Sequence, residues 1–219
     1  MQKRSKSPSV CGALCVLFLL LVPTTGRAES VLENVFASIS LDGKKIGQIH
    51  FTLKSAPTGE VEELRTNASL SVLGFKVYNF AQHLHETWRN ASMQTLRSDA
   101  DDNGTDEKVR VRRASARYDA ERNGKPVDLP DGAFPDSIWH YVITKKSLLF
   151  NSVDLRLMKI SVARKEETIT HHGKSVAAER FDFTGDWVAT LWYGKNQRLL
   201  KAHSTVDGRD IVIAVDADT

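Results

Sequence analysis

The chain has 219 residues, of which 26% are charged and 8% aromatic, and its formal net charge at neutral pH is +3. Four of its basic residues lie among the first 28 residues, and the rest of the chain has 26 basic against 27 acidic side chains. This balance excludes a strongly basic protein of the kind that binds nucleic acid. Both cysteines, Cys11 and Cys15, also lie in that first stretch, so the remainder holds no disulfide, catalytic thiol or cysteine metal ligand.

The first 28 residues have the form of a secretory signal peptide. Three basic residues precede a short apolar run at residues 12–22, and the small residues Gly26 and Ala28 stand where a signal peptidase cleaves. We therefore expect a mature chain of residues 29–219 in the periplasm or outside the cell. Since the apolar run is too short to anchor the protein, we expect no transmembrane segment after cleavage.

Alternation of apolar and polar residues with a period of two dominates the mature chain. The first alternating run covers residues 35–41, and Asp42-Gly43 reverses it into a second run at residues 46–53. Further hairpin signals are Asn123-Gly124 and Asp207-Gly208. Many such runs with turn residues between them predict a mainly antiparallel sheet of about ten strands.

One segment departs from this alternation. Residues 135–150 contain Ser137 as a helix-capping residue, with Ile138, Tyr141 and Val142 at helical spacing, and predict one helix. A single helix cannot cover a flat sheet of that size, so the sheet must curl. We expect one domain over residues 29–219: a strongly curved antiparallel sheet or half-open barrel, covered or plugged by this helix and enclosing an apolar cavity.

The strand around FAQHLHETWRN has two different faces. Tyr78, Glu86 and Trp88 share one face with other aromatic and aliphatic residues, which predicts that this face is interior. His83 and His85 then point outward. A metal site there would need a third ligand from a neighbouring strand, so we expect no metal and keep His83 and His85 only as an alternative.

Glu86 has two interpretations. An interior carboxylate must find a hydrogen-bond donor or raise its pKa, and the indole N–H of Trp88 lies two residues along on the same face. Glu86 then either closes a buried hydrogen-bonded pair or anchors the polar head of a ligand. No second carboxylate stands at a catalytic spacing, and no nucleophile or phosphate-binding motif is present, which argues against an enzyme and against a cofactor.

Several motifs in order resemble a known family. They are LDGKKIG in the first hairpin, HETWR at His85–Arg89, the loop RSDADDNG, the helix start PDSIWH and the late hairpin LWYGKNQRLL. The chain is similar to a secreted proteobacterial family of unknown function, which itself resembles the β half-barrels that carry lipids and lipoproteins through the periplasm. The resemblance implies an antiparallel sheet wrapped round a helix and implies no reaction.

These features support one leading function and two alternatives. The leading hypothesis is a binding protein for an apolar or amphipathic small molecule, such as a lipid or isoprenoid. Tyr78, Trp88, Trp139 and Trp192 would line or gate its cavity, and Glu86 would anchor the ligand. The first alternative is an envelope interaction or assembly module with a filled interior and a protein partner. The second is an envelope hydrolase that uses Glu86 or a histidine.

Overall fold

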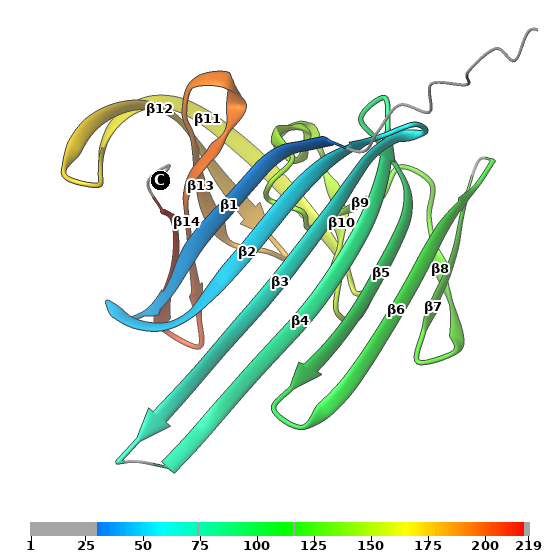
Figure 1. Cartoon of the computed structure of the whole chain (residues 1–219), viewed down its shortest axis with the longest axis horizontal. Helices are drawn as coiled ribbons and strands as arrows, with labels where there is room; N and C mark the ends of the chain where they lie inside the picture. The colour runs from blue at the N-terminus through cyan, green and yellow to red at the C-terminus, as the bar shows by residue number, and fades with distance from the viewer. Residues whose placement is uncertain (1–29, 74, 116, 217–219) are drawn as a thin grey trace, which may run out of the picture.

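A computed structural model describes residues 30–73, 75–115 and 117–216. The expected signal peptide lies outside these residues. The described strands form one sheet of fifteen (Figure 1). In chain order they are β1 (Ser30–Leu41), β2 (Lys44–Ala56), β3 (Gly59–Val72), β4 (Phe75–Arg89), β5 (Ser92–Asp102), β6 (Thr105–Ala114), β7 (Arg117–Arg122), β8 (Lys125–Leu129), β9 (Phe134–Pro135), β10 (Leu148–Phe150), β11 (Leu157–His171), β12 (Lys174–Gly185), β13 (Ala189–Tyr193), β14 (Leu199–Val206) and β15 (Arg209–Val215).

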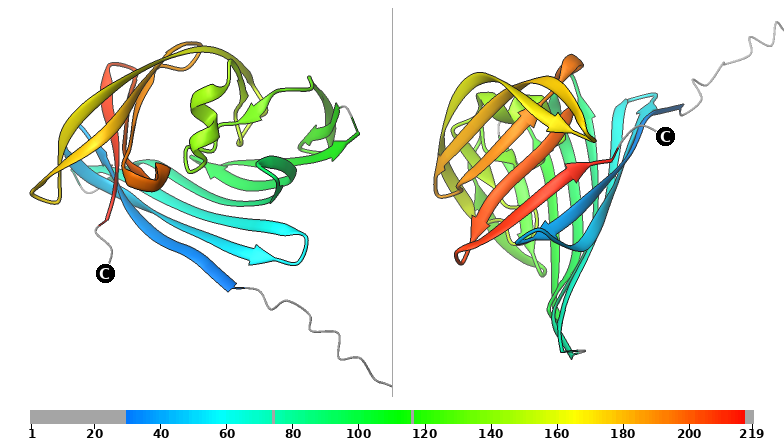
Figure 2. Two further views of the ribbon diagram at one scale, coloured as in Figure 1. Left: turned by 90° about the horizontal axis from the view of Figure 1, so that it is seen from above. Right: turned by 90° about the vertical axis from the view of Figure 1, so that its left-hand side faces the viewer.

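The order of the strands places the two ends of the described chain side by side within the sheet. The sheet runs from β8 back to β1, then from β15 back to β9. β1 pairs with β15, for example Ala37 with Val215, and every pairing is antiparallel except that of β9 with β10. The two edge strands, β8 and β9, follow each other in the sequence. The sheet curls strongly, and its concave side surrounds the segment between β9 and β10 (Figure 2).

The predicted hairpin turns are confirmed. Asp42 and Gly43 have φ angles of 47° and 79°, Asn123 and Gly124 have 51° and 73°, and Asp207 and Gly208 have 50° and 74°. Two successive positive φ angles are the mark of a type I′ turn, whose twist matches that of the strands it joins. Asp, Asn and Gly tolerate this conformation better than other residues, which explains why these dipeptides set the register of the sheet.

The predicted division of β4 into two faces is also confirmed. Leu84, Glu86 and Trp88 are 3%, 0% and 1% exposed and face the concave side. His83 is exposed and His85 half-buried on the convex side. The alternation thus buries one face of each strand against the interior, as the pleat of a strand requires.

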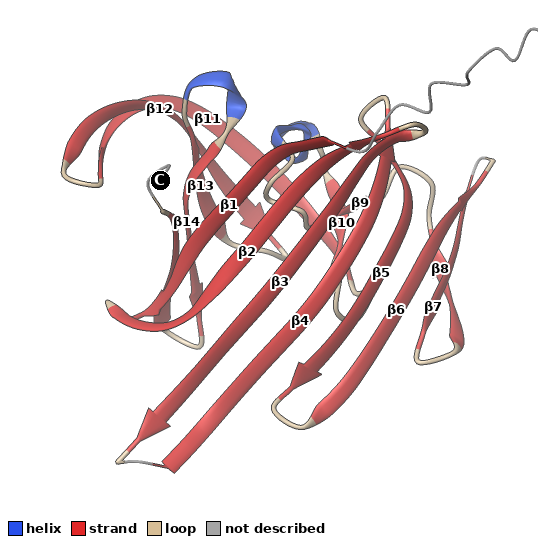
Figure 3. Cartoon of the chain, in the orientation of Figure 1, coloured by secondary structure: helices blue, strands red, loops and turns tan. Residues whose placement is uncertain are grey.

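The predicted helix at residues 135–150 is wrong. Figure 3 shows helical turns at only two places in the described chain, the 3-10 helices η1 (Tyr141–Lys145) and η2 (Lys195–Gln197). Ser137 does not cap a helix, because its hydroxyl donates a 2.7 Å hydrogen bond to Glu86 Oε1. The spacing of Ile138 and Tyr141 also fits a 3-10 turn, in which residues three apart share a face. An irregular segment therefore fills the place of the expected covering helix.

The expected count of about ten strands is also wrong. β7 and β8 have six and five residues, and β9 and β10 have two and three. Strands this short leave little or no alternation in the sequence. No helix in the described ranges has the length and apolar character that crossing a membrane requires.

Candidate functional site between two cavities

An apolar cavity of about 330 Å³ lies on the concave side of the sheet. Strands β1 to β4 and β15 form one wall, and the segment between β9 and β10 forms the other together with Ser152 of the β10–β11 loop and Trp187 of the β12–β13 loop. Most of its lining is aliphatic or aromatic: Ile39, Ile46, Ile49, Leu64, Ala68, Tyr78, Phe80, Leu84, Ile138, Trp139, Trp187, Ile211 and Ile213. This composition and size are those of a pocket for a small apolar molecule.

The polar groups of this cavity gather around Ser152. Gln82 Nε2 donates hydrogen bonds to Ser152 Oγ at 3.3 Å and to Ser98 Oγ at 3.0 Å. The backbone N–H of Ser152 donates to Asp136 Oδ1 at 3.0 Å, and Asn151 Nδ2 donates to Asp136 Oδ2 at 3.1 Å. Burial raises the pKa of the Asp136 carboxyl to about 6. The cavity therefore has polar hydrogen-bonding side chains gathered in one part of a largely apolar wall.

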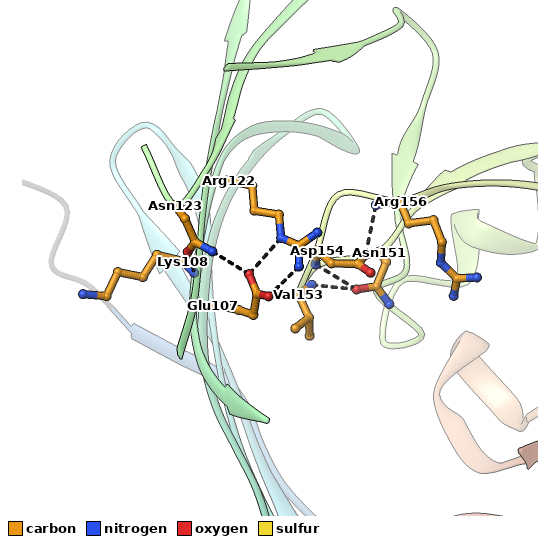
Figure 4. Close-up of polar contacts among 8 residues, drawn as sticks. All are labelled: Glu107, Lys108, Arg122, Asn123, Asn151, Val153, Asp154 and Arg156. Carbon is orange, nitrogen blue, oxygen red and sulfur yellow. Dashed lines mark hydrogen bonds and ion pairs between the residues drawn. The ribbon is translucent and has the colours of Figure 1, made fainter. Parts of the chain in front are cut away.

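The loop that carries Ser152 is fixed by its own side chains (Figure 4). Asn151 Oδ1 accepts hydrogen bonds from the backbone N–H groups of Val153 at 2.8 Å and Asp154 at 3.1 Å. The Asp154 carboxylate accepts one from the backbone of Arg156 at 2.9 Å. These local bonds are typical of Asn and Asp in turns, and they hold Ser152 at the cavity wall.

A second set of contacts supports this loop from the sheet. Glu107 on β6 is 8% exposed and accepts hydrogen bonds from both ends of the Arg122 guanidinium and, at 2.9 Å, from Asn123 Nδ2. These bonds hold the pKa of Glu107 below its usual value. Figure 4 shows the Arg122 side chain extending toward Asp154, whose charge raises the pKa of Arg122 further. Charge-assisted hydrogen bonds thus join β6 to β7, and the attraction between Arg122 and Asp154 links these strands to the loop.

A cluster of two buried carboxylates and an imidazole lies deeper in the concave side. We call Glu62, Glu86 and His140 the acid–histidine cluster. Glu62 Oε2 lies 2.5 Å from His140 Nε2, and both glutamates are 0% exposed. Glu86 Oε2 accepts a 2.9 Å hydrogen bond from Trp88 Nε1, as the sequence predicted, and its Oε1 accepts one from Ser137. One ligand-type atom from each member lies within 4.8 Å of the others.

The electrostatics of the cluster are those of a desolvated carboxylate pair. Burial raises the pKa of Glu86 well above its usual value, and the charge of Glu62 raises it further. The hydrogen bonds from Ser137 and Trp88 act in the opposite direction and do not offset the burial. Glu86 therefore holds a proton, or needs a nearby cation, at pH values where an exposed glutamate is charged.

The cluster is connected to a second, more polar cavity. This polar cavity has a volume of about 630 Å³, and His140 forms part of its wall together with Glu60, His171 and Lys174. Ser137, on the other side of the cluster, lines the apolar cavity. Trp139 lines both cavities. The acid–histidine cluster thus lies between them: His140 borders the polar cavity directly, and the hydrogen bond from Ser137 to Glu86 links the cluster to the wall of the apolar cavity.

The five residues expected to bind a ligand lie in three different places. Tyr78 and Trp139 line the apolar cavity. Glu86 belongs to the acid–histidine cluster and Trp88 donates a hydrogen bond to it, and neither residue is part of the apolar cavity's wall. Trp192 is on the convex face, where its indole donates a hydrogen bond to Glu167 and the cations of Arg180 and Lys201 lie over its ring. The expectation that Trp192 lines the cavity is wrong, because its neighbours on β13 take the interior positions.

Two members of the cluster were missed in the sequence. Glu62 shares the concave face of β3 with Leu64, Thr66 and Ala68. The alternation of that strand could therefore have predicted that Glu62 is interior. His140 lay inside the expected helix and gave no comparable signal. His83 and His85 do not join such a cluster: His83 instead lies 2.8 Å from Glu63 on the convex face, and in the described part of the chain only the acid–histidine cluster gathers three side chains of metal-ligand type.

Comparisons with known proteins support the fold and the family. One solved structure, described as the "Crystal Structure of Beta-barrel-like Protein of Domain of Unknown Function DUF1849 from Brucella abortus", superposes with a TM-score of 0.58 at 9% identity. The match covers 84% of this chain and 95% of that one, so the two share a β-barrel-like fold. No curated protein matches the sequence. The family "Domain of unknown function (DUF6134)" matches residues 38–216. The chain therefore belongs to the DUF6134 family.

Proposed function

We propose that this protein binds an apolar or amphipathic small molecule, such as a lipid or isoprenoid, in the apolar cavity, and does so in the periplasm or outside the cell. The observation that carries the proposal is the cavity of about 330 Å³, whose wall is aliphatic and aromatic over most of its area. Burial of an apolar ligand against such a wall is favourable by about 25 cal/mol per Å². The form of the first 28 residues supports the location.

The ligand's polar group would lie near Ser152 and Gln82. Hydrogen bonds join these two residues and Asp136 in one part of the cavity wall, whereas Tyr78 and Phe80 supply apolar surface farther along β4. This arrangement moves the expected anchor from Glu86 to the Ser152 region. Glu86 does not line the cavity, but the Ser137 hydroxyl, which does, donates a hydrogen bond to it.

Two variants on adjacent residues test the proposal. Ala68 is 9% exposed and faces the cavity, whereas Asn67 is exposed on the opposite face of the same strand. Ala68→Trp places an indole inside the cavity, and Asn67→Trp places the same ring in solvent. We expect Ala68→Trp to abolish the uptake of a fluorescent fatty acid and Asn67→Trp to preserve it. Equal uptake by both variants would place the ligand elsewhere.

A second function is favoured by the tip of the β3–β4 hairpin. Leu73, Phe75 and Val77 are 93%, 75% and 50% exposed, and Figure 1 shows the hairpin extending beyond the neighbouring strands. Exposed apolar residues that gather in this way mark interaction sites. If the protein is an envelope interaction module, Phe75→Ser should abolish crosslinking to its partner. The same variant should take up a fluorescent fatty acid in the cavity as the wild type does.

A further inference from the structure

We propose that Glu62, Glu86 and His140 together bind one divalent transition-metal ion, such as Zn²⁺. Glu62 comes from β3, Glu86 from β4, and His140 from the segment between β9 and β10. One donor atom of each lies within 4.8 Å of the other two. The three ligands are far apart in the sequence, so the site forms only when the sheet has curled around that segment.

The first observation in favour is an unpaired oxygen. Glu62 is 0% exposed, and its Oε1 atom is buried without a hydrogen-bond partner, whereas Oε2 contacts His140. A buried polar atom without a partner costs free energy, and native proteins rarely leave one in place. A cation bound to the cluster would supply the missing partner through bidentate coordination by Glu62.

The second observation is the balance of charge. Among the ion pairs of the described residues, none brings a lysine or arginine to Glu62 or Glu86, and His140 alone faces Glu62. Two desolvated carboxylates need two positive charges, and a divalent ion supplies both while leaving the imidazole neutral. Because imidazole nitrogen is among the donors, a transition metal suits the site better than Ca²⁺ or Mg²⁺, which prefer oxygen ligands alone.

Neighbouring side chains hold Glu86 and His140 in place. Trp88 and Ser137 hydrogen-bond to Glu86, and the Trp88 ring lies over the His140 ring with centroids 3.9 Å apart. Such outer contacts orient ligands and sustain metal affinity. Three protein ligands leave a fourth position open on Zn²⁺. Because His140 lines the polar cavity, an ion can reach the cluster from that side.

Binding requires only a small movement. Two ligand atoms at about 2.1 Å from a tetrahedral ion lie roughly 3.4 Å apart. Glu62 Oε2 and His140 Nε2 lie 2.5 Å apart, so the imidazole must withdraw by less than about 1 Å to admit the ion. His140 is in a stretch between β9 and η1 rather than within a strand, and this position allows the adjustment.

The test is a metal titration of the untagged protein after dialysis against a chelator. We expect one Zn²⁺ per chain by calorimetry and elemental analysis, a rise in the unfolding midpoint with Zn²⁺, and the visible spectrum of tetrahedral Co²⁺ when cobalt replaces zinc. A protein that takes up no stoichiometric Zn²⁺, with an unfolding midpoint insensitive to it, overturns the proposal. The buried charge would then be balanced by a proton shared between Glu62 and Glu86.

Variants assign the ion to the cluster. Glu62→Gln and His140→Ala should abolish stoichiometric binding, and Ser137→Ala should weaken it by roughly 10- to 100-fold because Glu86 loses an orienting bond. His83→Ala and His171→Ala are controls that should bind as the wild type does. Binding that survives both Glu62→Gln and His140→Ala also overturns the proposal. If either of these variants does not fold, the wild-type Co²⁺ spectrum and the graded loss in Ser137→Ala still decide the question.

Discussion

Trp139 stacks on Phe51 with ring centroids 4.6 Å apart and planes 12° from parallel, and it forms part of the wall of both cavities. The stacking fixes the segment between β9 and β10 to strand β2. The Trp139 indole therefore lies between the apolar and the polar cavity.

The first prediction concerns this ring. Trp139→Ala removes a half-buried aromatic contact, so we expect a loss of about 2 kcal/mol in the free energy of unfolding. We also expect faster release of a bound fluorescent fatty acid, because the two cavities become continuous. Trp139→Phe should preserve both properties by keeping the stack. Urea denaturation and stopped-flow displacement measure the two effects, and equal release rates in all three proteins would show that Trp139 does not separate the cavities.

The second prediction concerns Glu86 in metal-free protein. Glu86→Gln can still accept a hydrogen bond from Trp88 and can donate one to Ser137, so we expect the free energy of unfolding to change by less than about 1 kcal/mol. Glu86→Ala leaves the Trp88 N–H buried without an acceptor and creates a void, so we expect a loss of about 3 kcal/mol. Chemical denaturation in the presence of a chelator compares them. Equal losses in the two variants would show that hydrogen bonding at this position is not what stabilises the fold.

The third prediction concerns pH. Burial, and to a smaller extent the charge of Asp154, raises the pKa of Asp136 to about 6 from 3.8. The folded protein therefore holds this proton more tightly than the unfolded chain, and the stability that it contributes is present below pH 4 and is lost as pH rises to 6. The size of the loss is up to roughly 3 kcal/mol.

Asp136→Asn isolates that contribution. The variant keeps an acceptor for the Ser152 N–H but turns an amide toward Asn151 Nδ2, so we expect a loss of about 1 kcal/mol at every pH. As pH rises from 4 to 6.5, the free energy of unfolding of the wild type should fall relative to that of the variant. Unfolding midpoints in urea across this range measure it, and parallel pH profiles would refute a raised Asp136 pKa.

The fourth prediction concerns the start of β3. Gly59 has a φ angle of 143°, and a Cβ at this position would overlap the backbone carbonyl oxygen of Trp88. Gly59→Ala should therefore cost more than about 2 kcal/mol and shift Trp88, whose fluorescence reports the change. Gly43→Ala is the matched control, because its φ angle is 79° but its Cβ would meet nothing within 4 Å. We expect that control to lose about 1 kcal/mol, and a similar loss in both would contradict the close approach at Trp88.

Local chemistry explains which parts of the fold the sequence predicted. Asp42-Gly43 and Asn123-Gly124 determine their turns by themselves, and the alternation on β4 places Trp88 inside and His83 outside. The segment from Pro135 to Phe150 was not predictable in this way. The spacing of three from Ile138 to Tyr141 fits an α-helix and a 3-10 turn alike. Ser137 bonds to Glu86 across the interior rather than to its own backbone.

The candidate site was predictable only in part, for the same reason. The bond between Trp88 and Glu86 joins residues two apart on one strand and could be inferred from the pleat. The contact between His140 and Glu62 joins residues 78 positions apart and depends on how the sheet curls. Trp192 was misplaced because aromatic residues occupy both faces of β13, so alternation does not say which of them is interior.

The most direct test of ligand binding is mass spectrometry of an organic extract of the protein, purified from an exporting host without detergent. We predict one apolar or amphipathic molecule per wild-type chain, retained in Asn67→Trp and absent from Ala68→Trp. An extract that holds no such molecule, from a protein that also takes up none when incubated with a total lipid extract, would contradict the account.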